Sequence, residues 1–342
     1  MSHQDFAWAI VGPGRIAARF AEAVQALPGL RLHSVQGRDA ARSQAFAAAW
    51  SRPGRPPVRS VATLPALLAD PEVDGVYVAT PHALHGGAVR AALLAGKPVL
   101  CEKPLVPSLA EGQALVALAR ERGVFLMEAV WTRFLPLYRE HLQGWLREQA
   151  IGPLRAIQSS FCFPAPYDPA GRLFDPALAG GALLDIGIYN LTVTRWLLQQ
   201  ALGSCPEPAT LQVDGVLAPS GVDQRIAATL VFPGGVSSQF VCALDASSDN
   251  SLRVFGARGV ISLPRNFWRA TEASLQLHGS ETAQQVAAPL RINGFEGEIE
   301  EAVRCIRAGL VESPLMPHAE SLATLAWMDE IRRRLGLRYP FE

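Results

Sequence analysis

The sequence predicts an α/β protein in which a doubly wound parallel sheet is followed by an α+β domain built on a large, mostly antiparallel sheet. Over residues 1–127, short apolar runs alternate with segments of helical periodicity, the pattern of a parallel sheet covered by helices on both faces. From residue 128 to 342, strand-like runs follow one another with turn signals such as Phe232-Pro233-Gly234-Gly235 and few helices between them. We therefore predict two domains, 1–127 and 128–342.

The composition is that of an ordinary globular protein. Of 342 residues, 49% are hydrophobic and 18% charged, and 31 basic residues balance 31 acidic ones. This balance gives no electrostatic reason to expect binding to nucleic acid or to an anionic membrane. No apolar run reaches the ~18 residues of a membrane-spanning helix, and the first residues lack the basic and apolar regions of a targeting segment. We expect a cytoplasmic protein. Its five cysteines are scattered singly, which favours reduced thiols over disulfides or zinc sites.

A glycine-rich turn follows the first predicted strand, Phe6–Val11. Residues 12–17 follow the pattern Gly-x-Gly-x-x-Ala, and helical periodicity then continues to Leu27. Gly12 permits a tight turn, Gly14 lets a pyrophosphate approach the backbone, and Ala17 lets the helix pack on the strand. The first helical N–H groups, from Arg15 and Ile16 onward, face the phosphates. A tight turn without a ligand is the competing interpretation. The second strand, Leu30–Val35, completes the context of a Rossmann dinucleotide site.

The residues after the second strand indicate which dinucleotide binds. An acidic residue at this position holds the ribose 2′-hydroxyl of NAD, whereas arginine suits the 2′-phosphate of NADP. Arg38 and Arg42 lie one helical turn apart and can both face one phosphate. Asp39 is either a ribose ligand or the N-cap of a helix over Ala40–Trp50, and we favour the N-cap. The sequence therefore predicts NADP as the cofactor, with NAD as a possible alternative.

Further candidate cofactor contacts come where later strands end. The strand predicted over Asp74–Thr80 ends at Thr80 and is followed by Pro81, and Glu102-Lys103 follows the strand Val99–Cys101. Ligands of parallel sheets bind beyond these carboxyl ends. Lys103 is one of only two lysines in the chain, and a lysine offers an adjustable pKa that arginine lacks. The competing interpretation is a surface lysine before a proline.

The second domain is expected to carry the substrate chemistry on one helix. Asp185 and Tyr189 are four residues apart in a helix that starts at Gly180-Gly181 and reaches Leu198, so they share a face. A tyrosine next to a cation has a lowered pKa and can exchange a substrate proton. Alternatively, Tyr189 is a core aromatic and Asp185 a cap. The other elements expected after residue 128 are a helix over Pro136–Gln149, a strand over Leu154–Phe163, a loop over Pro164–Pro176, strands between Ala209 and Leu277, and helices over Glu296–Ala308 and His318–Leu335.

Several motifs make the whole chain resemble the glucose–fructose oxidoreductase, inositol dehydrogenase and MocA family. They are residues 10–14, Ala79-Thr80-Pro81-His82-x-x-His85, Cys101-Glu102-Lys103-Pro104-Leu105, residues 127–134 and residues 180–189. The last two motifs and the ending, with Met316-Pro317-His318 and Gly336-Leu337-Arg338-Tyr339-Pro340, look most like the dimeric dihydrodiol dehydrogenase and NADP-dependent D-xylose dehydrogenase branch. Many family members carry histidine where this chain has Tyr189, so the family's lysine–aspartate–histidine scheme does not transfer directly.

The resemblance implies an NADP-dependent oxidoreductase that moves a hydride between nicotinamide and the hydroxyl-bearing carbon of an aldose or a trans-dihydrodiol. It implies that Lys103 and Tyr189 act in catalysis, with Asp185 as substrate hydrogen-bonder or as orienter of Lys103, and that Pro81 and His85 line the nicotinamide pocket.

His82 and His85 lack a third ligand at suggestive spacing, so we expect no metal. Trp131, Phe161 and Phe267 are candidate substrate contacts, with ordinary core packing as the alternative. The rival functions are sugar–sugar hydride exchange on a retained cofactor and a non-catalytic NADP-binding sensor. An uncovered sheet face in the second domain and the resemblance both suggest a homodimer.

Overall fold

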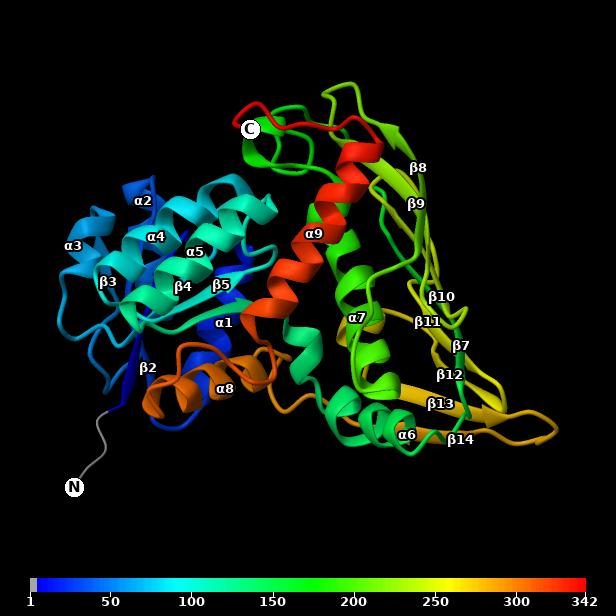
Figure 1. Ribbon diagram of the computed structural model, residues 1–342. Coiled ribbons are helices and arrows are strands. Elements are labelled where there is room, and N and C mark those ends of the chain that lie inside the picture. Colours follow the sequence, from blue (N-terminus) through cyan, green and yellow to red (C-terminus); the bar gives the residue numbers. More distant parts are fainter. Residues whose placement is uncertain (1–4) are drawn as a thin grey trace. The chain divides into compact units, whose positions relative to one another are not determined.

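The computed structural model describes residues 5–342, which form two compact units (Figure 1). The first unit comprises Met1–Ala129 and Arg291–Leu325, and the second comprises Val130–Leu290 and Ala326–Glu342. The chain therefore returns to the first unit after completing the second sheet. The predicted single boundary between residues 127 and 128 does not include this return. The return is anchored by polar contacts: Arg19 donates to the carbonyl of Asn293 over 2.6 Å, and the Asn293 amide donates to the carbonyl of Arg19 over 2.9 Å.

The first unit is built on a six-stranded sheet in which all strands run parallel. Its order is β3-β2-β1-β4-β5-β6. The central strand β1 is buried at every residue because helices cover both sheet faces. The order reverses between β1 and β4, and ligands of such sheets bind beyond the carboxyl ends of the strands at this point. The strands are β1 Phe6–Val11, β2 Leu30–Gln36, β3 Arg59–Val61, β4 Gly75–Val78, β5 Val99–Glu102 and β6 Leu126–Ala129.

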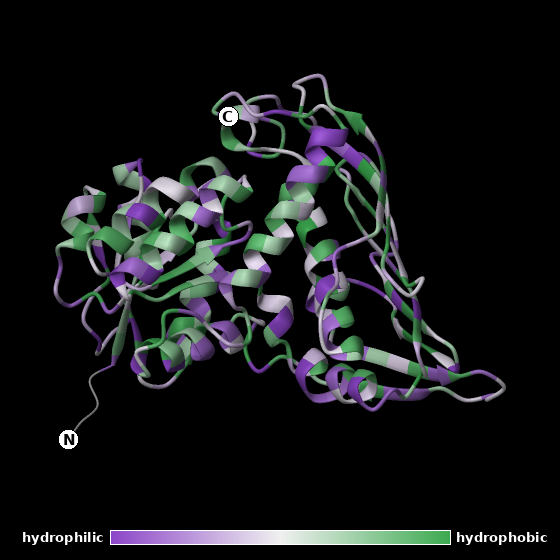
Figure 2. Cartoon of the chain, viewed as in Figure 1, coloured by the Kyte–Doolittle hydropathy of each residue, from purple (hydrophilic) through white to green (hydrophobic). Residues whose placement is uncertain are grey.

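This arrangement confirms the predicted doubly wound parallel sheet, and its central strands consist mostly of hydrophobic residues (Figure 2). The sequence pattern missed only the short edge strand β3, whose three residues are largely exposed and show no hydrophobic run. Two helices of this unit begin at a hydroxyl N-cap: the side chain of Thr63 caps α3 and that of Ser108 caps α5, each accepting a hydrogen bond from a backbone N–H. The helices of this unit are α1 Arg15–Ala26, α2 Ala40–Trp50, α3 Leu64–Leu68, α4 His85–Leu94, α5 Leu109–Arg122, α8 Glu296–Arg307 and the first half of α9 His318–Arg334.

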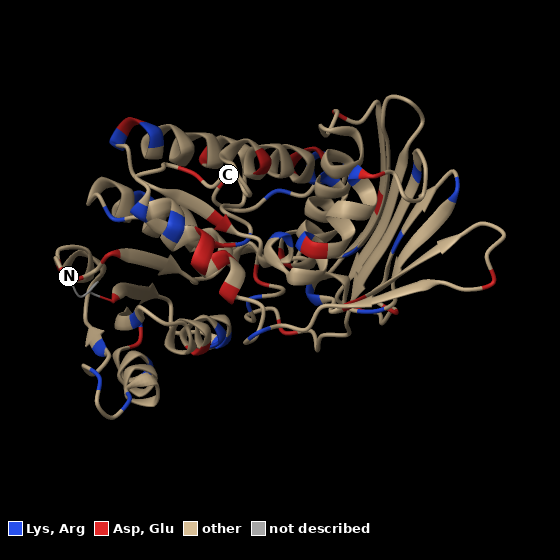
Figure 3. Cartoon of the chain, turned by 90° about the horizontal axis from the view of Figure 1, so that it is seen from below, with Lys and Arg blue, Asp and Glu red and all other residues tan. Residues whose placement is uncertain are grey.

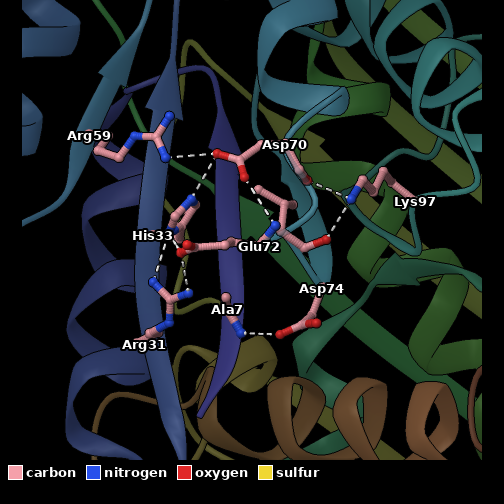
Figure 4. A network of polar contacts seen from close by, with 9 residues as sticks. Ala7, Arg31, His33, Arg59, Asp70, Glu72, Asp74 and Lys97 are labelled. Carbon is pink, nitrogen blue, oxygen red and sulfur yellow. Dashed lines mark hydrogen bonds and ion pairs between the residues drawn. The ribbon is translucent and has the colours of Figure 1, made fainter. Parts of the chain in front are cut away.

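A polar network fixes the loop that leads into β4 (Figure 4). The Asp70 carboxylate contacts Arg59 at 2.9 Å and His33 at 3.0 Å, and its hydrogen bond with His33 is the main reason why its pKa is lowered. The Lys97 ammonium donates to the carbonyls of Asp70 and Val73, each over 2.8 Å. One of the two lysines of the chain is therefore structural, since it satisfies carbonyls of this loop.

The second unit is built on an eight-stranded sheet of order β14-β13-β12-β11-β7-β10-β9-β8. Every neighbouring pair is antiparallel except β7 and β10, as predicted for a mostly antiparallel sheet. The strands are β7 Leu154–Cys162, β8 Thr210–Leu217, β9 Asp223–Val231, β10 Ser237–Ala243, β11 Leu252–Gly256, β12 Gly259–Leu263, β13 Glu272–Leu277 and β14 Gln284–Ala287.

One face of this sheet packs on a long buried helical run. The run begins with a π-helical turn, Leu183–Gly187, and continues as α7, Ile188–Leu202. By length and composition the stretch Pro176–Leu202 could cross a membrane, but 83% of its most apolar window is buried inside the protein, as in a core helix. The shorter helix α6, Gln143–Arg147, and the second half of α9 lie on the same face (Figure 1).

The other face of the eight-stranded sheet carries no helix in residues 5–342 (Figure 1). A hollow of about 640 Å³ lies on it, lined mostly by polar side chains such as Gln158, Ser160, Thr229 and Gln239. Charged residues of both signs are interspersed over the molecule rather than gathered in one field (Figure 3).

Candidate active site

The turn between β1 and α1 has the geometry of a phosphate site. Gly12 has φ +99°, and a Cβ there would lie 2.7 Å from the carbonyl oxygen of Ala79, so only glycine fits. Gly14 caps α1 without a side chain, and no atom lies within 4 Å of where its Cβ would be. The first turn of α1 contains no acidic residue, and Ala17 packs inward with no exposed surface. The free N–H groups at Arg15 and Ile16 thus suit the pyrophosphate of a dinucleotide.

Beyond β2, two arginines stand at the start of α2. The Asp39 carboxylate accepts a hydrogen bond of 3.1 Å from the backbone N–H of Arg42, which confirms Asp39 as the N-cap. The side chains of Arg38 and Arg42 are exposed. A carboxylate occupied in capping is a poor ribose ligand, whereas two exposed guanidinium groups suit a 2′-phosphate.

His85 joins the ends of β4 and β5. It is completely buried, with Nδ1 at 2.8 Å from the carbonyl oxygen of Pro104 and Nε2 at 2.8 Å from that of Thr80. Burial is the main cause that lowers its pKa, against the opposing effect of its hydrogen bonds with these two carbonyl groups. The contacts of His85 therefore fix the Thr80-Pro81 and Lys103-Pro104 segments side by side.

Glu102 and Lys103 end β5 at the same edge of the sheet. The buried Tyr77 hydroxyl donates a hydrogen bond to Glu102, and the Lys103 backbone N–H donates to the same carboxylate over 3.3 Å. Burial raises the pKa of Tyr77, which keeps its hydroxyl protonated as a donor. Lys103 is half-buried where the strand ends.

In the second unit, Tyr189 lies in a cluster of aromatic rings. The Trp131 indole N–H donates to the Tyr189 hydroxyl over 3.2 Å. The Phe161 ring centroid is 5.7 Å from that of Tyr189 and stacks on Trp268 at 3.4 Å. Phe267 is completely buried beneath these rings, whereas its neighbour Trp268 is partly exposed. Of the two, Trp268 is the ring that a ligand can reach.

Asp185, one turn before Tyr189, pairs with an arginine that the sequence analysis did not single out. Arg172 Nη1 donates to Asp185 Oδ1 over 3.0 Å, and Asp185 is only 6% exposed. Arg172 lies in the loop predicted over Pro164–Pro176 and is its only basic residue, a signal available in the sequence. That its partner is Asp185 followed from the tertiary structure alone.

The expected site residues thus fall into two sets. The glycine turn, Arg38, Arg42, Thr80, Pro81, His85, Glu102 and Lys103 belong to the first unit, and Trp131, Phe161, Asp185, Tyr189 and Phe267 belong to the second. Within each unit the members gather at one place: strand ends in the first, and the start of the long helix in the second. The first set can hold a dinucleotide, and the second offers a hydroxyl and a carboxylate beside aromatic rings.

Known proteins match the chain over nearly its whole length. Trans-1,2-dihydrobenzene-1,2-diol dehydrogenase from Danio rerio is 37% identical over 343 residues, covering 97% of each chain. The enzyme of the same name from Homo sapiens is 34% identical and covers 97% of this chain and 98% of its own. Among solved structures, an aldose-aldose oxidoreductase from Caulobacter crescentus complexed with glycerol has a TM-score of 0.83 at 26% identity, covering 97% of this chain and 98% of its own.

A structure with bound cofactor is equally similar. A 3-ketoreductase from Actinomadura kijaniata in complex with NADP and TDP-benzene gives a TM-score of 0.82 at 27% identity, over 96% of this chain and 98% of its own. Residues 6–130 match the family model of oxidoreductases with an NAD-binding Rossmann fold, and residues 140–262 match the GFO/IDH/MocA C-terminal domain. The chain belongs to the GFO/IDH/MocA family of NAD(P)-dependent oxidoreductases.

Proposed function

We propose that the protein is an NADP-dependent dehydrogenase for a trans-dihydrodiol or an aldose. The observation that carries this proposal is the Tyr189 hydroxyl, held by Trp131 inside an aromatic cluster and one turn from Asp185. Relatives named for a cyclic dihydrodiol and a structural neighbour named for aldoses share this fold at full length. Stacked aromatic rings suit the face of a cyclic substrate.

The proposed roles follow from the chemistry of each group. When bound, NADP would supply the hydride acceptor, and this chain's own residues would supply positioning and proton transfer. Tyr189, as the phenolate, would take the proton of the substrate hydroxyl as the hydride leaves the same carbon for the bound cofactor. Lys103 assists by placing positive charge near the developing alkoxide, and Asp185 with Arg172 orients a neighbouring hydroxyl. The glycine turn, Arg38 and Arg42 hold the phosphates.

The test is a cofactor-reduction assay on the purified protein. With NADP added to a panel of trans-dihydrodiols and aldoses, we expect absorbance of reduced nicotinamide to rise with at least one substrate. Activity on paired aldoses without added NADP, with cofactor retained through purification, would instead indicate sugar–sugar exchange. Tight NADP binding with no turnover on either panel would indicate a non-catalytic sensor.

We also place the protein in a reducing compartment, the cytoplasm. All five cysteines are free thiols, and Cys101, Cys162, Cys242 and Cys305 are buried. Free thiols are typical of proteins in compartments where glutathione and thioredoxin keep cysteine reduced.

We further propose a homodimer formed through the helix-free face of the eight-stranded sheet. Two-fold dimers are the commonest assemblies, and this face exposes Val216 and Val241 among polar side chains. Wild-type protein should sediment at twice its 36.8 kDa chain mass at micromolar concentration. Val241→Arg, in the middle of the face, should sediment as a monomer. Leu94→Arg, an exposed position at the end of α4, is the control and should stay dimeric. A monomeric wild type would contradict the proposal.

A further inference from the structure

The two glycines before the Asp185–Tyr189 helix are required by their neighbours. A Cβ on Gly180 would lie 2.7 Å from the carbonyl oxygen of Leu173. Gly181 has φ +120°, and a Cβ there would collide with the Asp223 carboxylate. The Gly181 N–H donates to the Leu173 carbonyl over 2.8 Å, which ties the loop of Arg172 to this turn. The turn is therefore closely enclosed on two sides.

Asp223 caps the helix from a distant strand. It begins β9, has no exposed surface, and its Oδ2 accepts a hydrogen bond of 2.6 Å from the backbone N–H of Leu183. Leu183 is the first residue of the helical run, so the Asp223 side chain caps the N-terminal end of that run. This capping residue lies 40 positions after the N–H that it satisfies, where a local N-cap would lie within three.

Tyr339 holds the same turn from the C-terminal segment. Its buried hydroxyl donates to the carbonyl oxygen of Gly180 over 2.7 Å. The Arg332 guanidinium lies 5.1 Å from the Tyr339 ring centroid and pairs with Asp329 at 2.6 Å and Glu342 at 2.7 Å. The hydroxyl is thus fixed by a segment that is itself anchored to α9.

We propose that Asp223 and Tyr339 are positioning residues, which fix the Gly180-Gly181 turn and so set the placement of Asp185 and Tyr189. The proposal rests on the proposed function, because it gives those two side chains chemical roles. Errors of about 1 Å in the position of reacting groups cost up to 10²-fold in rate. Losing one anchor of the turn should therefore reduce turnover without touching the cofactor site.

Tyr339→Phe is the first test, because it keeps the ring and removes only the hydroxyl. We expect kcat to fall about tenfold, KM for NADP to stay unchanged, and amide hydrogen exchange over residues 182–189 to accelerate without substrate. Thr194→Val is the matched control. It removes a buried 2.8 Å hydroxyl contact between α7 and Ser238, away from the turn. It should cost similar thermal stability but leave kcat within twofold.

Asp223→Asn tests the cap, because asparagine keeps an oxygen acceptor for Leu183. Burial raises the pKa of Asp223 to about 7, against the opposing effects of backbone hydrogen bonds, that of Leu183 first, and of Arg332. Tyr339 and Cys242 also face the Asp223 side chain. Between pH ~4 and ~7 the folded state then holds a proton that the unfolded state has lost, so stability falls as pH rises through this window. Between pH ~4 and ~7 the free energy of unfolding of the wild type should therefore fall relative to that of Asp223→Asn. Outside this window the two should depend on pH in the same way.

The outcomes separate the two proposals. If wild-type protein reduces NADP with none of the substrates, the proposed function fails, while hydrogen exchange still reports on the turn. If the wild type is active and Tyr339→Phe matches Thr194→Val in kcat and in exchange, the positioning proposal alone fails. A pH-independent stability difference for Asp223→Asn would contradict the buried cap.

Discussion

Replacing Tyr189 by phenylalanine is expected to lower kcat by roughly 10²- to 10⁴-fold, the range typical of a general acid or base. The substitution keeps the ring in contact with Phe161 and removes only the hydroxyl that Trp131 holds. NADP affinity should survive, because Tyr189 and the phosphate-binding turn belong to different units. Steady-state kinetics together with NADP titration measures both quantities. Near-normal turnover would mean that another group takes the proton, and Asp185 and His85 would be tested next.

Lys103→Met should cause a loss of the same order, and the double variant shows whether the two residues act on one step. Independent contributors lose activity additively in free energy, whereas a coupled pair loses most of it with either member. We expect Lys103→Met/Tyr189→Phe to be little worse than the poorer single variant. Lys97→Met is the control, since this other lysine holds the carbonyls of Asp70 and Val73. It should lower thermal stability and spare kcat. Full additivity would contradict the coupled pair.

Replacing Arg38 and Arg42 together by alanine should raise KM for NADP about 10²-fold and leave KM for NAD nearly unchanged. Hydrogen bonds to charged groups contribute ~1.5–3 kcal/mol, and ~1.4 kcal/mol is a factor of ten, so losing both guanidinium contacts accounts for an effect of this size. The Asp39 cap uses the backbone N–H of residue 42, so it survives the substitution. Measuring both cofactors on the same preparations isolates the 2′-phosphate.

Arg90→Ala is the matched control for the arginine pair. Arg90 is an exposed arginine of α4 in the same unit, and its loss should change neither constant. An equal rise in KM for NADP and NAD would contradict the assignment, because the two cofactors differ only at the 2′-phosphate.

Sequence patterns determined the parts of this protein that depend on neighbours close along the chain. The buried strand β1, the turn at Gly12 and the cap at Asp39 were predicted because burial periodicity and capping act within one or two turns. The alternation of strand and helix likewise predicted a parallel sheet, because parallel neighbours require crossover connections. The chemical roles of Lys103, Asp185 and Tyr189 stay predictions.

Only the tertiary structure decided how the second set of residues is held. Tyr339 reaches Gly180 across 159 positions, Asp223 reaches Leu183 across 40, and Arg172 meets Asp185 from a loop without periodicity. The tertiary structure also decided that the Phe267 ring is buried while the Trp268 ring is partly exposed. The two are adjacent aromatic residues, and no sequence motif distinguishes them. Such contacts depend on how a strand, a loop and the C-terminal segment pack around one helix. No local pattern encodes them, because a carboxylate or hydroxyl can satisfy any backbone group that folding brings within hydrogen-bond distance.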